Sequence, residues 1–145
     1  MKAVIQRAAH ASVTVDDEVI GQIGQGLCVL VGVTHDDTEA HAVKLADKLW
    51  KMRIFTDDEG KMNRSVADVS GELLIISQFT LYGDARKGNR PGFTNAARPE
   101  LAAPLIDLVV SELEAKGATV GTGRFGADMK VDLRNDGPVT IILEL

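Results

Sequence analysis

The chain has a single cysteine, no hydrophobic run of membrane-spanning length and no excess of positive charge. Cys28 cannot form an internal disulfide bond, and its apolar neighbours predict a buried, unreactive thiol, because reactive thiols need polar and partly exposed surroundings. A membrane helix needs roughly 20 apolar residues, and the N-terminus also lacks the apolar region of a secretory signal. We therefore expect a soluble protein of the cytoplasm that makes no membrane contact.

Motifs for metals, nucleotide cofactors and serine hydrolysis are also missing. The histidines His10, His35 and His41 have no close ligand spacing, and surface or capping roles suffice for the last two, which flank a predicted helix start. The glycines around residue 24 are not followed by the helix that a dinucleotide site requires, and Ser77 does not lie in a nucleophile elbow. The sequence therefore predicts no metal and no cofactor, and it offers no familiar set of catalytic side chains.

Positive charge is concentrated in one segment of an otherwise acidic chain. The net charge of −5 argues against a protein that binds nucleic acid over its whole surface. Residues 85–98 nevertheless contain four cations and no acidic residue: Arg86, Lys87, Arg90 and Arg98. Glycine and proline within the segment predict a long loop, which we call the basic loop. Charge clusters are usually solvated loops, but loops of this length are often functional.

The remaining patterns predict a single α/β domain over residues 1–145. Apolar residues at helical spacing predict a helix from Asp36 or Asp37 to Met52, with Asp36 and Glu39 in capping-box spacing. A second helix is expected from Pro99 to Lys116, closed by Gly117, although Pro104 can delay or distort its start. Strands are predicted at residues 2–8, 11–15, 18–23, 27–33, 53–55, 72–81, 118–125, 129–134 and 139–145.

Two local features remain unexplained by this pattern. Polar residues Ser77, Gln78 and Thr80 follow a very apolar strand, where a strand that simply emerges into solvent is the plainer interpretation. Gly137-Pro138 separates two apolar strands, where a tight turn suffices, although the Gly–Pro bond can also be cis.

Together, these two segments resemble the signature motifs of the D-aminoacyl-tRNA deacylase family. The motifs are Ser77-Gln78-Phe79-Thr80-Leu81 and Asn135-Asp136-Gly137-Pro138-Val139-Thr140, and the likeness extends from residues 1–7 through 123–129 to the C-terminus. The resemblance implies a three-layer α/β/β fold, in which two helices pack on largely antiparallel or mixed sheets. It also implies a homodimer with active sites at the subunit interface, which hydrolyses the ester between a D-amino acid, or to some extent glycine, and the 3′ end of tRNA.

The resemblance assigns chiral selection to the backbone. Gly137-Pro138 is expected to be cis and to reach into the pocket of the partner subunit, where its carbonyls hold the α-amino group and exclude an L side chain. Arg7 matches the position that helps to fix this segment, although an edge-strand surface role would also explain it. A backbone amide, that of Phe79, is expected to stabilise the oxyanion, while the 2′-hydroxyl of the tRNA assists catalysis.

The other expected site residues have supporting roles. Ser77 and Gln78 would hold the pocket, and Thr80 would shape it or form hydrogen bonds. Phe125 and Met129 would be wall residues, for which an ordinary core position is an equal alternative. In the basic loop, Arg86, Lys87 and Arg90 would meet tRNA phosphates.

Two other functions remain as alternatives. A related branch of the superfamily edits L-alanine mischarged onto tRNA, but it departs from the present motifs at the positions of Ser77, Phe79 and Val139. A non-catalytic nucleic-acid-binding protein is the second alternative, and its direct support is the basic loop. The acidic net charge argues against it.

Overall fold

The computed structural model describes residues 1–145, with two α-helices among eight strands. The helices are α1 (Glu39–Lys51) and α2 (Pro99–Ala115), with one short 3-10 helix, η1 (Phe79–Tyr82). The strands are β1 (Lys2–Val15), β2 (Glu18–Ile23), β3 (Gly26–Gly32), β4 (Phe55–Thr56), β5 (Met62–Arg64), β6 (Glu72–Ser77), β7 (Val120–Thr122) and β8 (Lys130–Glu144). No helix combines the length and apolar character that crossing a bilayer demands.

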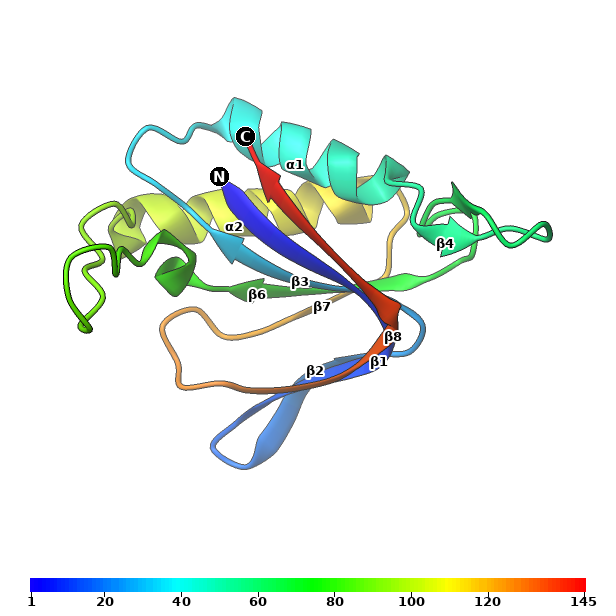
Figure 1. Cartoon of the computed structure of the whole chain (residues 1–145), viewed down its shortest axis with the longest axis horizontal. Coiled ribbons are helices and arrows are strands. Elements are labelled where there is room, and N and C mark those ends of the chain that lie inside the picture. Colours follow the sequence, from blue (N-terminus) through cyan, green and yellow to red (C-terminus); the bar gives the residue numbers. More distant parts are fainter.

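One six-stranded sheet contains every strand except the β4–β5 hairpin. Its strand order is β2-β1-β3-β6-β7. Strand β8 pairs antiparallel with β1, from the residue pair Lys2 and Glu144 to the residue pair Thr14 and Lys130. Register shifts opposite Gln6 to His10 interrupt this pairing, and there the two long strands bend together. The bend folds the sheet over itself, so that the helices, the middle strands and the far ends of β1 and β8 form three layers (Figure 1). The expected α/β/β arrangement is confirmed.

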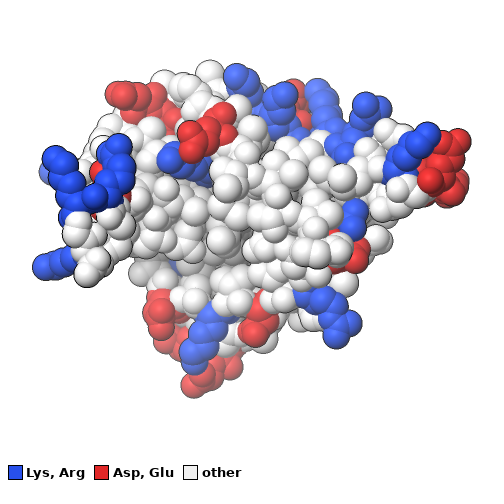
Figure 2. Space-filling view, in the orientation of Figure 1, with Lys and Arg blue, Asp and Glu red and all other residues white.

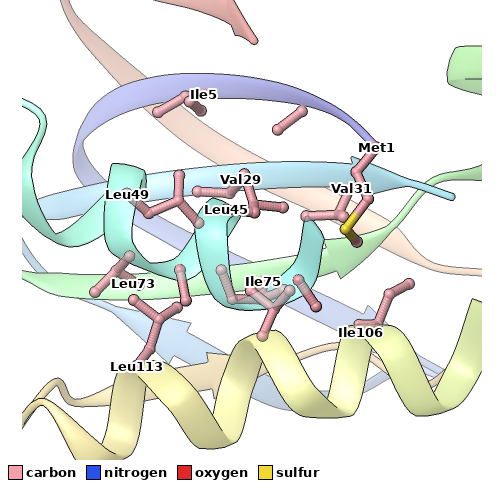
Figure 3. Close-up of a cluster of buried hydrophobic side chains, with 14 of the residues drawn as sticks. Met1, Ile5, Val29, Val31, Leu45, Leu49, Leu73, Ile75, Ile106 and Leu113 are labelled. Atoms are coloured by element: carbon pink, nitrogen blue, oxygen red, sulfur yellow. The ribbon is translucent and has the colours of Figure 1, made fainter. Parts of the chain in front are cut away.

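The strands β3 and β6 lie in the middle layer and divide their side chains between two cores. Val29 of β3 and Ile75 of β6 point toward the helices, into the larger core drawn in Figure 3. Their neighbours Cys28 and Leu74 point the other way, into the smaller core beneath. A strand with both faces covered has no polar face, which is why residues 27–33 are apolar throughout.

Cys28 is fully buried in the smaller core. Burial raises the pKa of its thiol to about 11, because a thiolate is poorly solvated there. The thiol is therefore neutral at physiological pH, and the predicted burial of Cys28 is confirmed.

The second helix follows the sequence pattern closely. It begins at Pro99 and ends at Ala115, one residue before the expected Lys116, and it accommodates Pro104 within its length. Gly117 adopts a φ of 92° and donates its N–H to Glu114 O at 2.9 Å, while Ala118 N–H bonds Leu113 O at 3.1 Å. These two bonds form the Schellman motif that a glycine at this position favours.

The predicted start of the first helix is wrong by about two residues. Its N-cap is Thr38, and the capping box joins Thr38 to His41 rather than Asp36 to Glu39. Asp37 is unavailable as a cap because its buried carboxylate accepts the Met1 ammonium at 2.5 Å and the Thr34 N–H at 2.7 Å. The capping role proposed for His41 is confirmed.

Several predicted strand boundaries are also wrong. Residues 2–8 and 11–15 form one strand, as do 129–134 and 139–145, because β1 and β8 pair across both breaks. The strand predicted at 72–81 ends at Ser77, and the strand predicted at 118–125 is limited to β7. After Ser77 the chain turns into η1, where the Leu81 N–H donates to Gln78 O at 3.2 Å. The strand predicted at 53–55 lies at Phe55–Thr56, and β5 is a strand that the pattern missed.

Candidate functional site

A cavity of about 620 Å³ opens at the end of β6, beside η1. Its walls are largely apolar, with aromatic rings from three separate segments of the chain. The lining includes Ser77, Gln78, Phe79, Phe93, Phe125 and Met129. A mostly apolar cavity with a few polar groups is the usual form of a small-molecule site. Phe125 and Met129 are therefore wall residues in this structure.

The motif at residues 77–80 is fixed to the middle layer by backbone bonds. Ser77 ends β6 opposite Val31 of β3, and the Gln78 N–H donates to Val31 O at 2.8 Å. The chain then turns, and the ring of Phe79 meets that of Phe93 edge-on, with centroids 5.2 Å apart. Because the first N–H groups of a helical turn have no partners within that turn, the amide of Phe79 belongs to a donor-rich backbone segment at the cavity wall.

Thr80 is exposed and stands outside the cavity lining. Its hydroxyl accepts a hydrogen bond from the Gln78 side-chain amide, which is a neutral donor and not a base. A threonine nucleophile needs an adjacent base to remove its proton. The structure places no histidine or carboxylate in that role.

The cavity lining also contains Phe93, Arg98 and Asp128, which the sequence analysis did not propose as site residues. Phe93 and Arg98 belong to the basic loop, where the sequence analysis counted Arg98 among the cations but proposed only Arg86, Lys87 and Arg90 as site residues. Asp128 lies in the segment 123–129 that carries part of the family resemblance. A pattern search for paired catalytic groups finds none of them, because each is brought to the cavity by the fold alone.

The Gly137–Pro138 segment lies away from this cavity. Its peptide bond is cis, as expected, and both residues are exposed. It sits in β8 near the bend of the sheet, whereas η1 lies at the other end of the middle layer (Figure 1). None of the residues from 135 to 140 lines the cavity. Within one chain, the two motifs do not meet.

Arg7 anchors the Gly137–Pro138 segment to the rest of the fold. Its Nε donates to Asp136 O at 2.9 Å, and its Nη1 donates to Ile54 O at 2.7 Å. The Asp136 carboxylate lies 3.6 Å from the same Nε, and the Arg7 side chain is only 11% exposed. Arg7 is therefore a bridge between two backbone segments rather than a surface residue.

The Asn135 side chain also holds the Gly137–Pro138 segment in place, through three hydrogen bonds. Its Oδ1 accepts the Val139 N–H at 2.8 Å, and its Nδ2 donates to Gln6 Oε1 at 2.8 Å and to Thr140 Oγ1 at 3.0 Å. One amide side chain thus ties both ends of the 136–138 loop to each other and to β1. The exposed segment is held in place by its surroundings.

The basic loop is irregular, as predicted, and its four cations are exposed. Arg86 forms an ion pair with Asp84, with contacts of 2.9 and 2.7 Å, and this partner lowers the pKa of Asp84 to about 2. Lys87 and Arg90 have no carboxylate within 4.0 Å. Figure 2 shows the cations of this loop gathered at one end of the molecule.

The family model described as D-Tyr-tRNA(Tyr) deacylase matches residues 4–144. The chain belongs to this family. The D-aminoacyl-tRNA deacylases of Roseiflexus sp. (strain RS-1) and Clostridioides difficile (strain 630) are each 58% identical to it over 144 residues, which cover 99% of this chain and 93% and 97% of theirs. The resemblance identified in the sequence is confirmed.

Solved structures of similar proteins support the family's fold for the whole chain. The c-Myc DNA Unwinding Element Binding Protein superposes with a TM-score of 0.93 at 42% identity, covering 100% of this chain and 99% of its own. A probable eukaryotic D-amino acid tRNA deacylase shares the fold, with a TM-score of 0.84 at 18% identity, covering 99% of this chain and 98% of its own.

Proposed function

We propose that this member of the family hydrolyses the ester between a D-amino acid and the 3′ end of tRNA, in a cavity completed by the Gly137–Pro138 segment of a second copy. The observation that carries the composite site is the separation of the two motifs within one chain. The cavity is largely apolar, and the segment with fixed carbonyls is exposed elsewhere. A homodimer in which each segment enters the partner's cavity brings the two together.

Chiral selection follows from fixed backbone geometry. Carbonyl oxygens on the anchored segment accept hydrogen bonds from the α-ammonium group, and this sets the direction in which the side chain must point. A D side chain then lies toward open space, whereas an L side chain meets the segment itself. Glycine has no side chain to exclude, so glycyl-tRNA is expected to be cleaved to some extent.

The chemistry is hydrolysis of an ester. Water adds to the ester carbonyl carbon, and the bond from that carbon to the tRNA 3′ oxygen breaks, which releases the D-amino acid and a free 3′-hydroxyl. The backbone amide of Phe79 donates to the developing oxyanion, a contribution of about 3–4 kcal/mol for one such donor. The 2′-hydroxyl of the tRNA positions or activates the water, while Ser77 and Gln78 hold the cavity wall.

The basic loop supplies contacts to the tRNA backbone. Lys87 and Arg90 are exposed and unpaired, so they are free to meet phosphates near the acceptor end. Arg86 holds the loop through Asp84 and can exchange this partner for a phosphate. Such contacts weaken with salt and carry little sequence information, which suits an enzyme that acts on many tRNAs.

The deciding experiment compares hydrolysis of D-tyrosyl-tRNA and L-tyrosyl-tRNA by the purified protein, with and without a chelator. Rapid loss of the D ester alone, unaffected by the chelator, is the expected result. Stability of both esters would favour a non-catalytic nucleic-acid-binding protein. Selective loss of L-alanyl-tRNA in a parallel reaction would instead assign the chain to the editing branch.

Replacing Thr80 by alanine should leave substantial deacylase activity, because no base in the structure activates its hydroxyl. We expect kcat to fall less than about tenfold, the loss of one neutral hydrogen bond. Single-turnover hydrolysis of D-tyrosyl-tRNA measures this directly. Complete loss of activity in a variant that folds and binds tRNA would restore threonine as the nucleophile.

Replacing Asn135 by alanine should slow hydrolysis of the D ester by about 10²-fold, because a displacement of about 1 Å in a site can have this effect. The variant loses the bonds to Val139, Gln6 and Thr140 together. Asn135→Asp retains the acceptor for the Val139 N–H but loses both donors, so an intermediate rate is expected. Equal and unchanged rates for both variants would show that the segment needs no such anchor.

A further inference from the structure

The unpaired cations of the molecule gather mainly in two groups. Of the 16 lysines and arginines, those without a carboxylate within 4.0 Å are Lys44, Lys48, Arg53, Lys87, Arg90, Arg98 and Arg134. The group at residues 87–98 belongs to the basic loop beside the cavity. The group at residues 44–53 belongs to α1 and the chain directly after it, and the proposed function has not used it.

The second group lies along one exposed side of α1. Lys44 and Lys48 are one helical turn apart, and Arg53 follows two residues after the helix ends. All three side chains are exposed, and Figure 2 shows cations along the edge of the molecule where α1 runs. The neighbouring Lys51 is paired with Asp47 at 3.1 Å, so it adds less to this surface than the other three. We call Lys44, Lys48 and Arg53 the helix cations.

The helix cations and the Gly137–Pro138 segment belong to one connected part of the fold. Arg7 bonds Asp136 O with one nitrogen and Ile54 O with another, so the backbone after Arg53 lies beside the backbone before Gly137. Leu143 of β8 shares a groove with Lys44 and Lys48, so α1 also runs beside the C-terminal half of this strand. Any surface that Gly137–Pro138 approaches is therefore near Arg53, and Lys48 and Lys44 follow along α1 beside the C-terminal half of β8.

We propose that Lys44, Lys48 and Arg53 bind backbone phosphates of the tRNA whose 3′ end lies in the partner's cavity. This inference rests on the proposed function, which places Gly137–Pro138 of one subunit in the cavity of the other. Each composite site then has unpaired cations on both sides, the basic loop from the subunit that owns the cavity and the helix cations from its partner. This arrangement also explains how a protein with a net charge of −5 holds a polyanion, because its free positive charge is collected at the two sites.

The first test measures KM and kcat for D-tyrosyl-tRNA over a range of salt concentrations, with Lys48→Glu and Arg53→Glu in the homodimer. Each variant should raise KM several-fold with little change in kcat, and each should lower the slope of log KM against log salt by about one. Lys130→Glu is the matched control, because it makes the same charge change at an exposed lysine that pairs with Asp17 beside the β1–β2 turn. An equal rise in KM for the control would assign the effect to overall charge and overturn the proposal.

The second test determines which subunit supplies the helix cations. One subunit carries Ala96→Trp, which fills its cavity, and the other carries Gly137→Ala, which disables its segment. Co-purification through two different tags isolates mixed dimers, in which one complete site remains. Lys48→Glu with Arg53→Glu is then added to either subunit.

The expected rise in KM occurs only when these changes are on the Ala96→Trp subunit, which supplies the working segment. A rise only when they are on the Gly137→Ala subunit would overturn binding across the interface, and no rise in either arrangement would overturn the surface altogether. If the unmodified mixed dimer is inactive while the wild-type homodimer is active, the composite site itself is refuted, and the inference falls with it.

Discussion

Replacing Gly137 by alanine is expected to reduce hydrolysis of D-aminoacyl-tRNA strongly while the fold remains intact. Gly137 has a φ of 132°, which L side chains rarely adopt, and an added Cβ would lie 2.8 Å from Val139 Cγ2 and 3.0 Å from Arg7 Nη2. Either the segment or the arginine must move. Movement of Arg7 weakens its bonds to Asp136 O and Ile54 O, so the carbonyls that we propose select the amino acid lose their position.

The expected loss in single-turnover rate is at least about 10²-fold, the effect of a displacement near 1 Å. Gly60→Ala is the matched control, because Gly60 also has a positive φ, 79°, but an added Cβ there meets nothing within 4 Å. It should cost about 1–2 kcal/mol of stability and leave activity unchanged. Wild-type rates in a folded Gly137→Ala variant would exclude the segment from the active site.

The largest effect on stability is expected from Gly26→Ala at the start of β3. An added Cβ would lie 1.8 Å from Glu72 O and 2.7 Å from both Glu72 C and N, all of them backbone atoms of the neighbouring strand β6. Backbone cannot turn aside as a flexible side chain can, so β3 and β6 must separate at their first residue pair. Both strands are buried on both faces, so the separation would disturb both cores.

We expect Gly26→Ala to reduce the free energy of unfolding by more than about 3 kcal/mol, beyond the usual cost of overpacking. Urea unfolding followed by circular dichroism measures the change. Gly24→Ala is the control two residues away, where the only neighbour of an added Cβ is Glu72 Oε2 at 3.6 Å. It should change stability by less than about 0.5 kcal/mol. Similar stabilities for the two variants would contradict the close approach of the strands.

Local patterns predicted those elements whose causes are local. The apolar run at 27–33 indicated a strand covered on both faces, and Gly117 indicated the end of α2. The start of α1 was mistaken because Asp37 is bound by Met1, 36 residues away in the chain. The break expected near residue 135 is bridged by Asn135 and Gln6, which are 129 residues apart. Contacts of this range leave no periodic trace in a sequence.

The candidate site likewise has parts that the sequence predicts locally and parts that only the fold brings together. The motifs at 77–81 and 135–140 were recognisable as short segments, and the fold places the first at a cavity and the second on an exposed, anchored loop. Residue order alone does not predict that the two motifs lie apart in space within one subunit. Phe93 and Asp128 reach the cavity from two further segments, and no spacing rule connects these with β6.

The position of Ser77 at the end of β6 limits how the proposed site can change in evolution. A catalytic side chain can be retuned by a new rotamer or a neighbouring charge, but a backbone donor moves only with its strand. Because β6 is enclosed on both faces, we expect its amide protons to exchange slowly with solvent and the proposed donor after it to be preorganised. Substitutions that loosen the cores would therefore reduce turnover before they unfold the protein, so that selection on activity also maintains rigidity.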